Sequence, residues 1–136
     1  MQNLSFLLVE DSAADAFLFK HTVAEAGLSN AVHWVETGAQ AVTYLAGEGR
    51  YGNRHAFPFP SVMFLDITLK DVNGLDVLAN VRSKYPSEAL LIIVLSGTDD
   101  PSAVRIASRG KADAFLRKPI RPRDLVNLAA QFPVHF

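Results

Sequence analysis

Five short apolar runs recur along the chain, and each is followed by a turn signal and a segment with helical periodicity. The fourth run, residues 90–95, is continuously apolar, which is typical of a strand covered by helices on both faces. Five alternations of strand and helix predict an α/β fold, with a five-stranded parallel sheet, five helices on both faces and right-handed crossovers. The expected strands are residues 6–9, 31–35, 62–65, 90–95 and 114–118, and the expected helices are residues 13–26, 37–46, 74–84, 101–108 and a last one that starts at Pro122.

Apolar side chains within these segments form the expected core. In the first helix, positions 16, 17, 19 or 20, 23 and 24 make up the buried stripe, and Gly27 ends the helix. Trp34 and the phenylalanines at 6, 17, 19 and 64 are expected in the core. The stretch from Gly47 to Pro60 is irregular and contains three aromatic residues. It is long for a loop in a compact domain, and such loops are often functional or ordered by a partner.

The composition fits a single domain over residues 1–136. Hydrophobic residues make up 49% and charged residues 20%, which argues against a disordered chain. The formal net charge of −1 gives no basic footprint for nucleic acid, and the absence of cysteine excludes disulfides and thiolate chemistry. The N-terminus lacks the pattern of a signal peptide, and the longest apolar stretch is too short to span a bilayer. We therefore expect a cytoplasmic protein that binds neither nucleic acid nor membrane.

Chemically useful side chains stand at the C-terminal ends of the expected strands. In open α/β sheets the binding crevice lies beyond those ends. The first strand is followed by Glu10 and Asp11, the third by Asp66, the fourth by Ser96, and the fifth ends at Lys118. Each residue alone is a plausible turn, cap or surface residue. Their joint placement instead predicts that three carboxylates, one hydroxyl and one ammonium converge.

This set of side chains suits metal-assisted phosphoryl transfer. Carboxylates packed together repel each other, and a divalent cation relieves that repulsion. Mg²⁺, or a similar cation such as Mn²⁺, prefers one or two carboxylates plus water and phosphate oxygens. With the cation bound, Asp66 can act as a nucleophile toward phosphorus and form an aspartyl phosphate. Lys118 and Ser96 supply the positioning and charge neutralisation that the transfer needs.

Four motifs in chain order resemble those of the response-regulator receiver family. They are LLVEDS at 7–12, FLDI at 64–67 with Gly74 eight residues after Asp66, VLSG at 94–97 and FLRKP at 115–119. The resemblance covers essentially the whole chain and implies the flavodoxin-like strand order 2-1-3-4-5.

The resemblance also implies a role for each matched residue. Asp66 corresponds to the phosphoacceptor and Lys118 to the lysine that pairs with the phosphate. Asp11 corresponds to a direct Mg²⁺ ligand, Glu10 to an acid that acts largely through water, and Thr68 to the position whose backbone carbonyl binds the metal.

The switch positions and one departure follow from the same resemblance. Ser96 corresponds to the hydroxyl that moves toward the phosphoryl group, and Phe115 to the aromatic residue that changes rotamer with it. The bond between Lys118 and Pro119 is expected to be cis. Many receivers carry proline where this chain has Lys70, which adds a cation near the site beside Asp71.

The implied function is a two-component phosphoacceptor without turnover chemistry. A histidine kinase or phosphotransfer protein donates the phosphoryl group, and the face made by the fourth helix, fifth strand and fifth helix binds a downstream protein or a second copy of the chain. No output domain is expected. The insert before the third strand, from Tyr44 to Pro60, is similar to that of single-domain regulators paired with phytochrome-type histidine kinases.

Two alternatives belong to other functional classes. A phosphohydrolase of the haloacid-dehalogenase type also uses a strand-end aspartate, but it needs a second acid two residues later, where this chain has Thr68. A pseudo-receiver is a binding module that no longer accepts phosphate, and such domains usually lose an acid or the lysine. The turnover of phosphate distinguishes the first alternative, and a failure to accept phosphate distinguishes the second.

Overall fold

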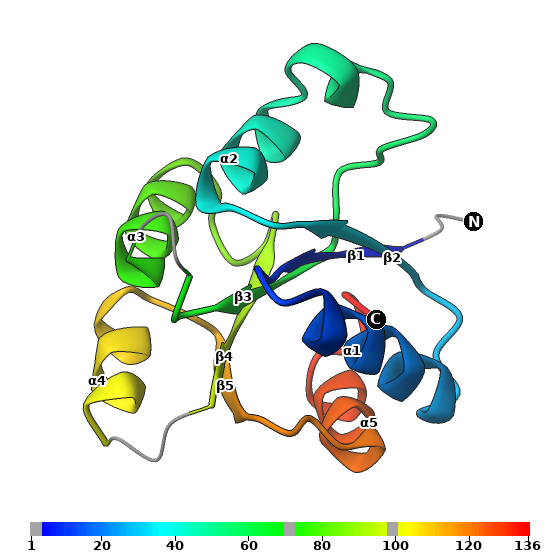
Figure 1. The fold of residues 1–136 in the computed structure, drawn as a ribbon, viewed down its shortest axis with the longest axis vertical. Helices are drawn as coiled ribbons and strands as arrows, with labels where there is room; N and C mark the ends of the chain where they lie inside the picture. The colour runs from blue at the N-terminus through cyan, green and yellow to red at the C-terminus, as the bar shows by residue number, and fades with distance from the viewer. Residues whose placement is uncertain (1–3, 70–72, 98–100) are drawn as a thin grey trace.

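The computed structural model describes residues 4–69, 73–97 and 101–136, which form one twisted sheet between two layers of helices (Figure 1). The five strands are parallel and lie in the order β2-β1-β3-β4-β5, so the predicted fold class and strand order are confirmed. The strands are β1 (Ser5–Val9), β2 (Ala31–Val35), β3 (Val62–Asp66), β4 (Leu91–Ser96) and β5 (Ala114–Arg117). The helices are α1 (Ala13–Glu25), α2 (Gly38–Ala46), α3 (Gly74–Lys84), α4 (Pro101–Arg109) and α5 (Pro122–Gln131), with a short 3₁₀ helix, η1 (Gly49–Gly52), after α2.

Alternate residues of each central strand enter opposite cores. In β1, Leu7 and Val9 pack on one face of the sheet, whereas Phe6 and Leu8 pack on the other. The first core lies under α2 and α3, and the second lies under α1 and α5 (Figure 1). All six residues of β4 are buried, because helices cover both of its faces. Among the described residues, no helix is long and apolar enough to cross a bilayer.

The helix ends follow the local sequence. The Ser12 hydroxyl caps α1 by accepting a hydrogen bond from the backbone N–H of Asp15, and the Thr37 hydroxyl caps α2 in the same way. Gly47 ends α2 with a left-handed backbone (φ = 69°), a conformation that glycine adopts without strain. The strand boundaries differ from the predicted ones by at most one residue, since β4 runs one residue later and β5 ends at Arg117.

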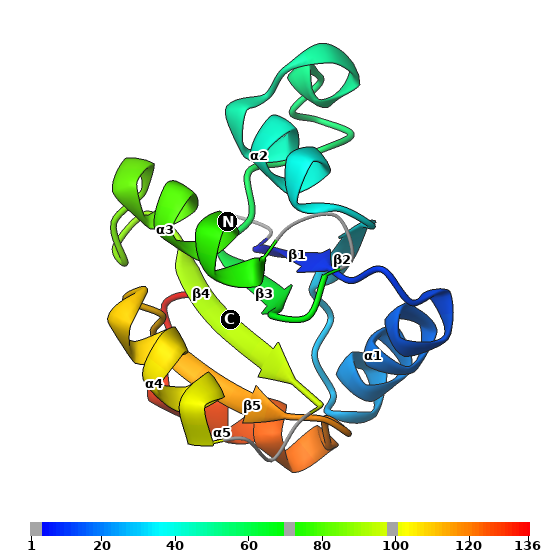
Figure 2. The same ribbon diagram turned by 60° about the vertical axis from the view of Figure 1, so that its left-hand side comes forward.

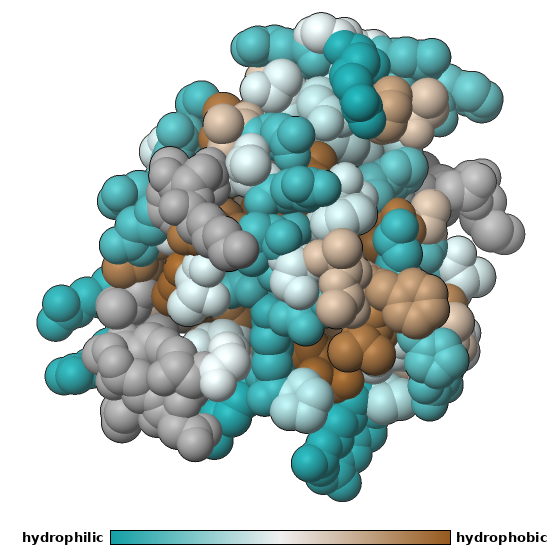
Figure 3. Space-filling view, in the orientation of Figure 1, coloured by the Kyte–Doolittle hydropathy of each residue, from teal (hydrophilic) through white to brown (hydrophobic). Residues whose placement is uncertain are grey.

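The expected core position of Phe17 is wrong. The buried stripe of α1 consists of Ala16, Phe19 and Val23, and the Phe17 side chain is 72% exposed beside Leu18 at 58%. Successive helical residues are rotated by about 100°, so Phe17 turns away from the sheet when Ala16 faces it. Figure 3 shows apolar atoms at the surface in the region where Figure 1 places α1.

The irregular stretch after α2 is folded. Tyr51 of η1 and Phe57 pack on Tyr44, with ring centroids 4.9 and 6.1 Å away. The Arg54 guanidinium donates hydrogen bonds to the backbone carbonyls of Tyr44 and Leu45 at 2.8 and 2.7 Å, which satisfies the C-terminus of α2. The loop is therefore held by its own side chains against the edge of the core.

Candidate functional site

The parallel register brings the sequence-predicted acids to one edge of the sheet. Val9 lies opposite Leu65 in the neighbouring strand, so Glu10 and Asp11 follow β1 beside the end of β3, where Asp66 stands. Asp66 in turn lies opposite Leu95, directly before Ser96. The arrowheads of β1, β3, β4 and β5 all point toward this edge in Figure 2. The carboxyl ends of the strands thus gather these side chains although they are far apart in the sequence.

Lys118 forms the centre of an ion-pair network. Its Nζ atom lies 2.5 Å from Glu10 Oε1, 2.6 Å from Asp66 Oδ2 and 3.0 Å from Asp15 Oδ2. The side chains of Glu10 and Asp66 are only 2% and 3% exposed, whereas that of Asp15 is 44% exposed. Burial alone would lower the pKa of Lys118, but the hydrogen bonds to Asp66, Glu10 and Asp15 outweigh it and raise that pKa. The side chain is therefore an ammonium at neutral pH.

Both oxygen atoms of the Asp66 carboxylate accept hydrogen bonds. Its Oδ1 atom accepts hydrogen bonds from the backbone N–H and the hydroxyl of Thr68, both at 2.8 Å, while Oδ2 faces Lys118. Burial raises the pKa of Asp66, but the hydrogen bonds from Lys118 and Thr68 outweigh burial and lower it. The result is a buried, ionised carboxylate with a fixed orientation, which suits a nucleophile.

Glu10 is fixed through its backbone as well as its side chain. Its backbone N–H donates to the Val35 carbonyl, and its own carbonyl accepts the indole N–H of Trp34 at 2.7 Å. The backbone N–H of Ser12 donates to Oε2 at 3.1 Å. Burial raises the pKa of Glu10, and the nearby charge of Asp66 adds to this effect, while the hydrogen bond from Lys118 opposes it. Trp34 is the one tryptophan of the chain, so its fluorescence can report on this site.

Three carboxylates can hold a divalent cation beside Lys118. Glu10, Asp11 and Asp66 each offer an oxygen within 4.8 Å of the other two. Hard oxygen ligands of this kind fit Mg²⁺ or Mn²⁺. The one ammonium of Lys118 does not neutralise all of these carboxylates, and a bound cation relieves the repulsion that remains among them. Asp11 is half-buried at the edge of the group. The donor set thus fits the predicted metal, while the ligand role of the Thr68 carbonyl stays a prediction.

Sequence reasoning missed two sets of contacts in the site. Asp15, in the first turn of α1, reaches back to Lys118, and Thr68 binds Asp66 through its side chain as well as its backbone. The spacing Ser12-x-x-Asp15 signals a helix start. It does not reveal that the carboxylate turns toward a lysine 103 residues away.

Ser96 ends β4, and Phe115 lies in the neighbouring strand β5. Ser96 is fully buried, and its backbone carbonyl accepts the N–H of Lys118 at 2.8 Å. Phe115 is partly buried against the core under α2 and α3. The peptide bond between Lys118 and Pro119 is cis, as predicted. Lys70 and Asp71 lie outside the described residues.

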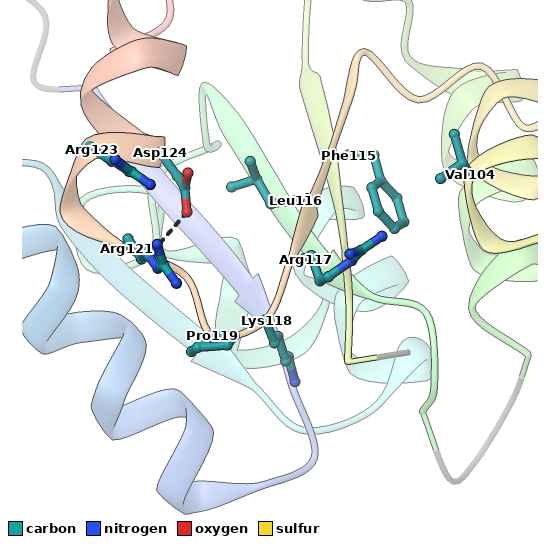
Figure 4. Close-up of a pocket in the computed structure, with 9 residues that line it drawn as sticks. All are labelled: Val104, Phe115, Leu116, Arg117, Lys118, Pro119, Arg121, Arg123 and Asp124. Atoms are coloured by element: carbon teal, nitrogen blue, oxygen red, sulfur yellow. Dashed lines mark hydrogen bonds between the residues drawn. The ribbon is translucent and has the colours of Figure 1, made fainter. Parts of the chain in front are cut away.

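A pocket of about 480 Å³ opens on the face formed by α4, β5 and α5 (Figure 4). Phe115 points from β5 toward Val104 of α4, and Leu116 points to the opposite side of β5, while Lys118 extends from the segment after β5 toward the end of β1. The pocket is lined by Val104, Phe115, Leu116, Arg117, Lys118, Pro119, Arg121, Arg123 and Asp124. Lys118 therefore belongs both to the acidic site and to the lining of this pocket.

Comparisons with known proteins agree with this geometry. Residues 6–130 match the family model described as "Response regulator receiver domain". The chain is similar to the response regulator Rcp1 of Synechocystis sp., with 25% identity over 122 residues that cover 90% of this chain and 81% of Rcp1. The solved Mn²⁺-bound form of Rcp1 has a TM-score of 0.73 and 25% identity, covering 95% of this chain and 91% of that one.

Two further solved structures are similar over nearly the whole chain. The response regulator RPA3017 in red light signalling of R. palustris has a TM-score of 0.81 and 25% identity, covering 95% of this chain and 90% of its own. The bacteriophytochrome response regulator RtBRR has a TM-score of 0.81 and 33% identity, covering 95% of this chain and 77% of its own. With the strand-end acids, the lysine and the family model in agreement, the chain belongs to the response-regulator receiver family of two-component signalling, and its structural neighbours include phytochrome-associated regulators.

Proposed function

We propose that this receiver accepts one phosphoryl group on Asp66 from a histidine kinase or a phosphotransfer protein. The observation that carries the proposal is the contact of Lys118 Nζ with both Glu10 and Asp66, beside three carboxylates that fit a divalent cation. A lysine held in this way is ready to pair with a phosphoryl oxygen as soon as one is attached to Asp66.

The transfer uses the chain's own groups in defined roles. An oxygen of Asp66 attacks phosphorus, the bond from phosphorus to the donor's imidazole nitrogen breaks, and the electron pair leaves with that nitrogen. Thr68 orients the attacking carboxylate through its two hydrogen bonds to Oδ1. Lys118 neutralises charge that develops on the phosphoryl oxygens. When bound, Mg²⁺ would neutralise further charge on the same oxygens from the side of Glu10 and Asp11.

The proposed switch runs from the buried site to the pocket on α4, β5 and α5. Ser96 is the hydroxyl that would move toward the phosphoryl group, and Phe115 would change position with it. Such a change shifts the population of two states of this face and alters what it binds. Among the residues that the structure describes, Arg117, Arg121 and Arg123 line the pocket beside one acid, Asp124. This charge favours a downstream protein with an acidic surface.

The proposed donor is a phytochrome-type histidine kinase, and the proposed location is therefore the cytoplasm. The similarity to RPA3017, RtBRR and Rcp1 supports this choice of donor. The stretch after α2 is the surface on which we propose that kinase selectivity depends; Arg54 and Phe57 hold it against Tyr44 and Leu45.

Labelling with acetyl phosphate tests the proposal without a known kinase. The native protein, with Mg²⁺ present, should gain one phosphoryl group by intact mass, and chelation of the metal should abolish the gain. Asp66→Asn should not label, whereas the control Asp76→Asn, an exposed acid in the first turn of α3, should label normally.

Two results would contradict the proposal. A native protein that does not label under these conditions is not a phosphoacceptor, and the binding-module alternative then gains. Steady release of phosphate from many substrates, without limit to one equivalent, indicates a turnover phosphohydrolase.

A further inference from the structure

The ammonium of Lys118 is saturated in the resting protein. An ammonium carries three N–H donors. Its three carboxylate acceptors are Glu10, Asp66 and Asp15, at 2.5, 2.6 and 3.0 Å. A phosphoryl oxygen that binds Lys118 must therefore take the place of one of these acceptors.

Asp15 is the acceptor that can leave most easily. Its contact with Lys118 is the longest of the three, and its side chain is 44% exposed against 2% for Glu10 and 3% for Asp66. Glu10 is anchored further by the backbone N–H of Ser12. A released Asp15 carboxylate is solvated at once by water, whereas a released Glu10 would remain a buried, unpaired charge.

Asp15 also lies beside the ammonium that contacts the phosphoacceptor, because Lys118 bridges Asp15 and Asp66. It belongs to the first turn of α1, and it lines a cavity of about 360 Å³ together with Lys118, Glu10 and Gly97. A small phosphodonor such as acetyl phosphate is an anion, so the carboxylate of Asp15 beside Lys118 repels it.

We propose that Asp15 is a positioning residue that occupies Lys118 until a phosphoryl group displaces it, and so weakens the binding of small anionic phosphodonors. The inference rests on the proposed function, since it concerns donor access to the same site. A protein donor brings its phosphoryl group with a large interface that offsets the competition, whereas acetyl phosphate has none. The resting contact thus favours the protein donor.

The reaction that is affected is the transfer from acetyl phosphate. An oxygen of Asp66 forms a bond to phosphorus, the bond from phosphorus to the acetyl oxygen breaks, and acetate leaves with the electron pair. Asp15 takes no part in these bond changes. Because each protein molecule is labelled once, kcat here means the maximal labelling rate constant and KM the acetyl phosphate concentration that gives half of it. Removal of the Asp15 charge should therefore lower KM for acetyl phosphate and leave kcat little changed.

Kinetics of labelling by acetyl phosphate in Mg²⁺, followed by Trp34 fluorescence and by intact mass, test the inference. Asp15→Asn should raise kcat/KM about fivefold, the factor that one unit charge a few ångströms away exerts through water-like surroundings. The gain should lie in KM and should shrink at high ionic strength, where surface charges are screened. Asp15→Glu keeps the carboxylate and should stay close to the native rate.

Asp76→Asn controls for the loss of an acid from the first turn of a helix, because Asp76 is the third residue of α3 as Asp15 is the third residue of α1. It should leave kcat and KM at their native values. A merely structural role of Asp15 would appear in unfolding experiments as a loss of stability, with KM unchanged.

The inference is overturned if Asp15→Asn labels at the native rate or more slowly, or if its change lies in kcat alone. In that case a native protein that still labels on Asp66 leaves the proposed function intact. A native protein that does not label at all overturns the proposed function and this inference together.

Discussion

Replacement of Lys118 by methionine should destabilise the protein strongly in the absence of metal. Methionine keeps the length and the apolar stem of the side chain but removes the charge. The ammonium is the shared partner of Glu10 and Asp66, whose side chains are 2% and 3% exposed. Without it, two buried carboxylates face each other, and Thr68 and Ser12 remain as their hydrogen-bond donors among the described residues.

The expected loss is about 3 kcal/mol of unfolding free energy, the lower end of the range for breaking a buried ion pair. The lower end applies because the Lys118 side chain itself is 20% exposed. Mg²⁺ should restore stability, by about 2.7 kcal/mol at roughly a hundred times its Kd. The stabilisation by Mg²⁺ should be larger in the variant than in the native protein, because three carboxylates without an ammonium hold the cation more tightly.

Urea unfolding followed by Trp34 fluorescence, with Mg²⁺ and with a chelator, measures both effects. Glu10→Gln removes one of the two facing charges, so the double variant Lys118→Met/Glu10→Gln should be more stable than Lys118→Met alone. The reasoning is refuted if Lys118→Met unfolds at the native urea concentration without metal. It is refuted equally if Glu10→Gln fails to recover stability in the Lys118→Met background.

Three further predictions concern other parts of the molecule. Gly74→Ala should lower the free energy of unfolding by about 1–3 kcal/mol and slow labelling, because a Cβ atom there would lie 2.6 Å from the backbone Cα and O atoms of Ile67, next to the phosphoacceptor. Urea unfolding and labelling rates measure these effects, and a variant with native stability and native labelling would contradict the prediction. Arg82→Ala should lower the free energy of unfolding by about 3 kcal/mol and leave labelling intact, because the guanidinium donates hydrogen bonds to three backbone carbonyls and to Asp113. If urea unfolding shows no greater loss than an ordinary surface substitution causes, Arg82 does not have this stabilising role. Burial lowers the pKa of His33, so the folded protein binds fewer protons than the unfolded chain, and stability should fall as pH decreases through about 6.5. His33→Gln should flatten that decline in urea midpoints between mildly acidic and neutral pH, and an unchanged slope would assign it to other groups.

The fold follows from the sequence because buried parallel strands leave a strong pattern. The six apolar residues before Ser96 are buried on both faces of β4, and such a run has few alternatives in a chain with five alternations of strand and helix. The crevice follows from the same pattern, since the carboxyl ends of parallel strands meet at one edge. Glu10, Asp66 and Lys118 were predicted to converge there, and their side chains are in contact.

The parts that sequence reasoning missed depend on side-chain orientation. Phe17 and Ala16 are neighbours in an apolar stretch, and only the packing of α1 on the sheet decides which of them is buried. Asp15 reads as a helix-start residue, and its contact with Lys118 depends on how α1 approaches the loop after β5. Gly74 matches the family motif, but its reason is visible only in three dimensions, where the backbone of Ile67 leaves no room for a Cβ atom.

The phosphoryl attachment site is the most direct test of the central claim. Borohydride reduction of the acetyl-phosphate-treated protein converts a phosphorylated aspartate to homoserine, and peptide mass spectrometry locates it. The account predicts homoserine at position 66 alone, formed only when Mg²⁺ is present during labelling. Homoserine at Asp11 or Asp15, or its absence from every peptide, would contradict the assignment of Asp66 as the phosphoacceptor.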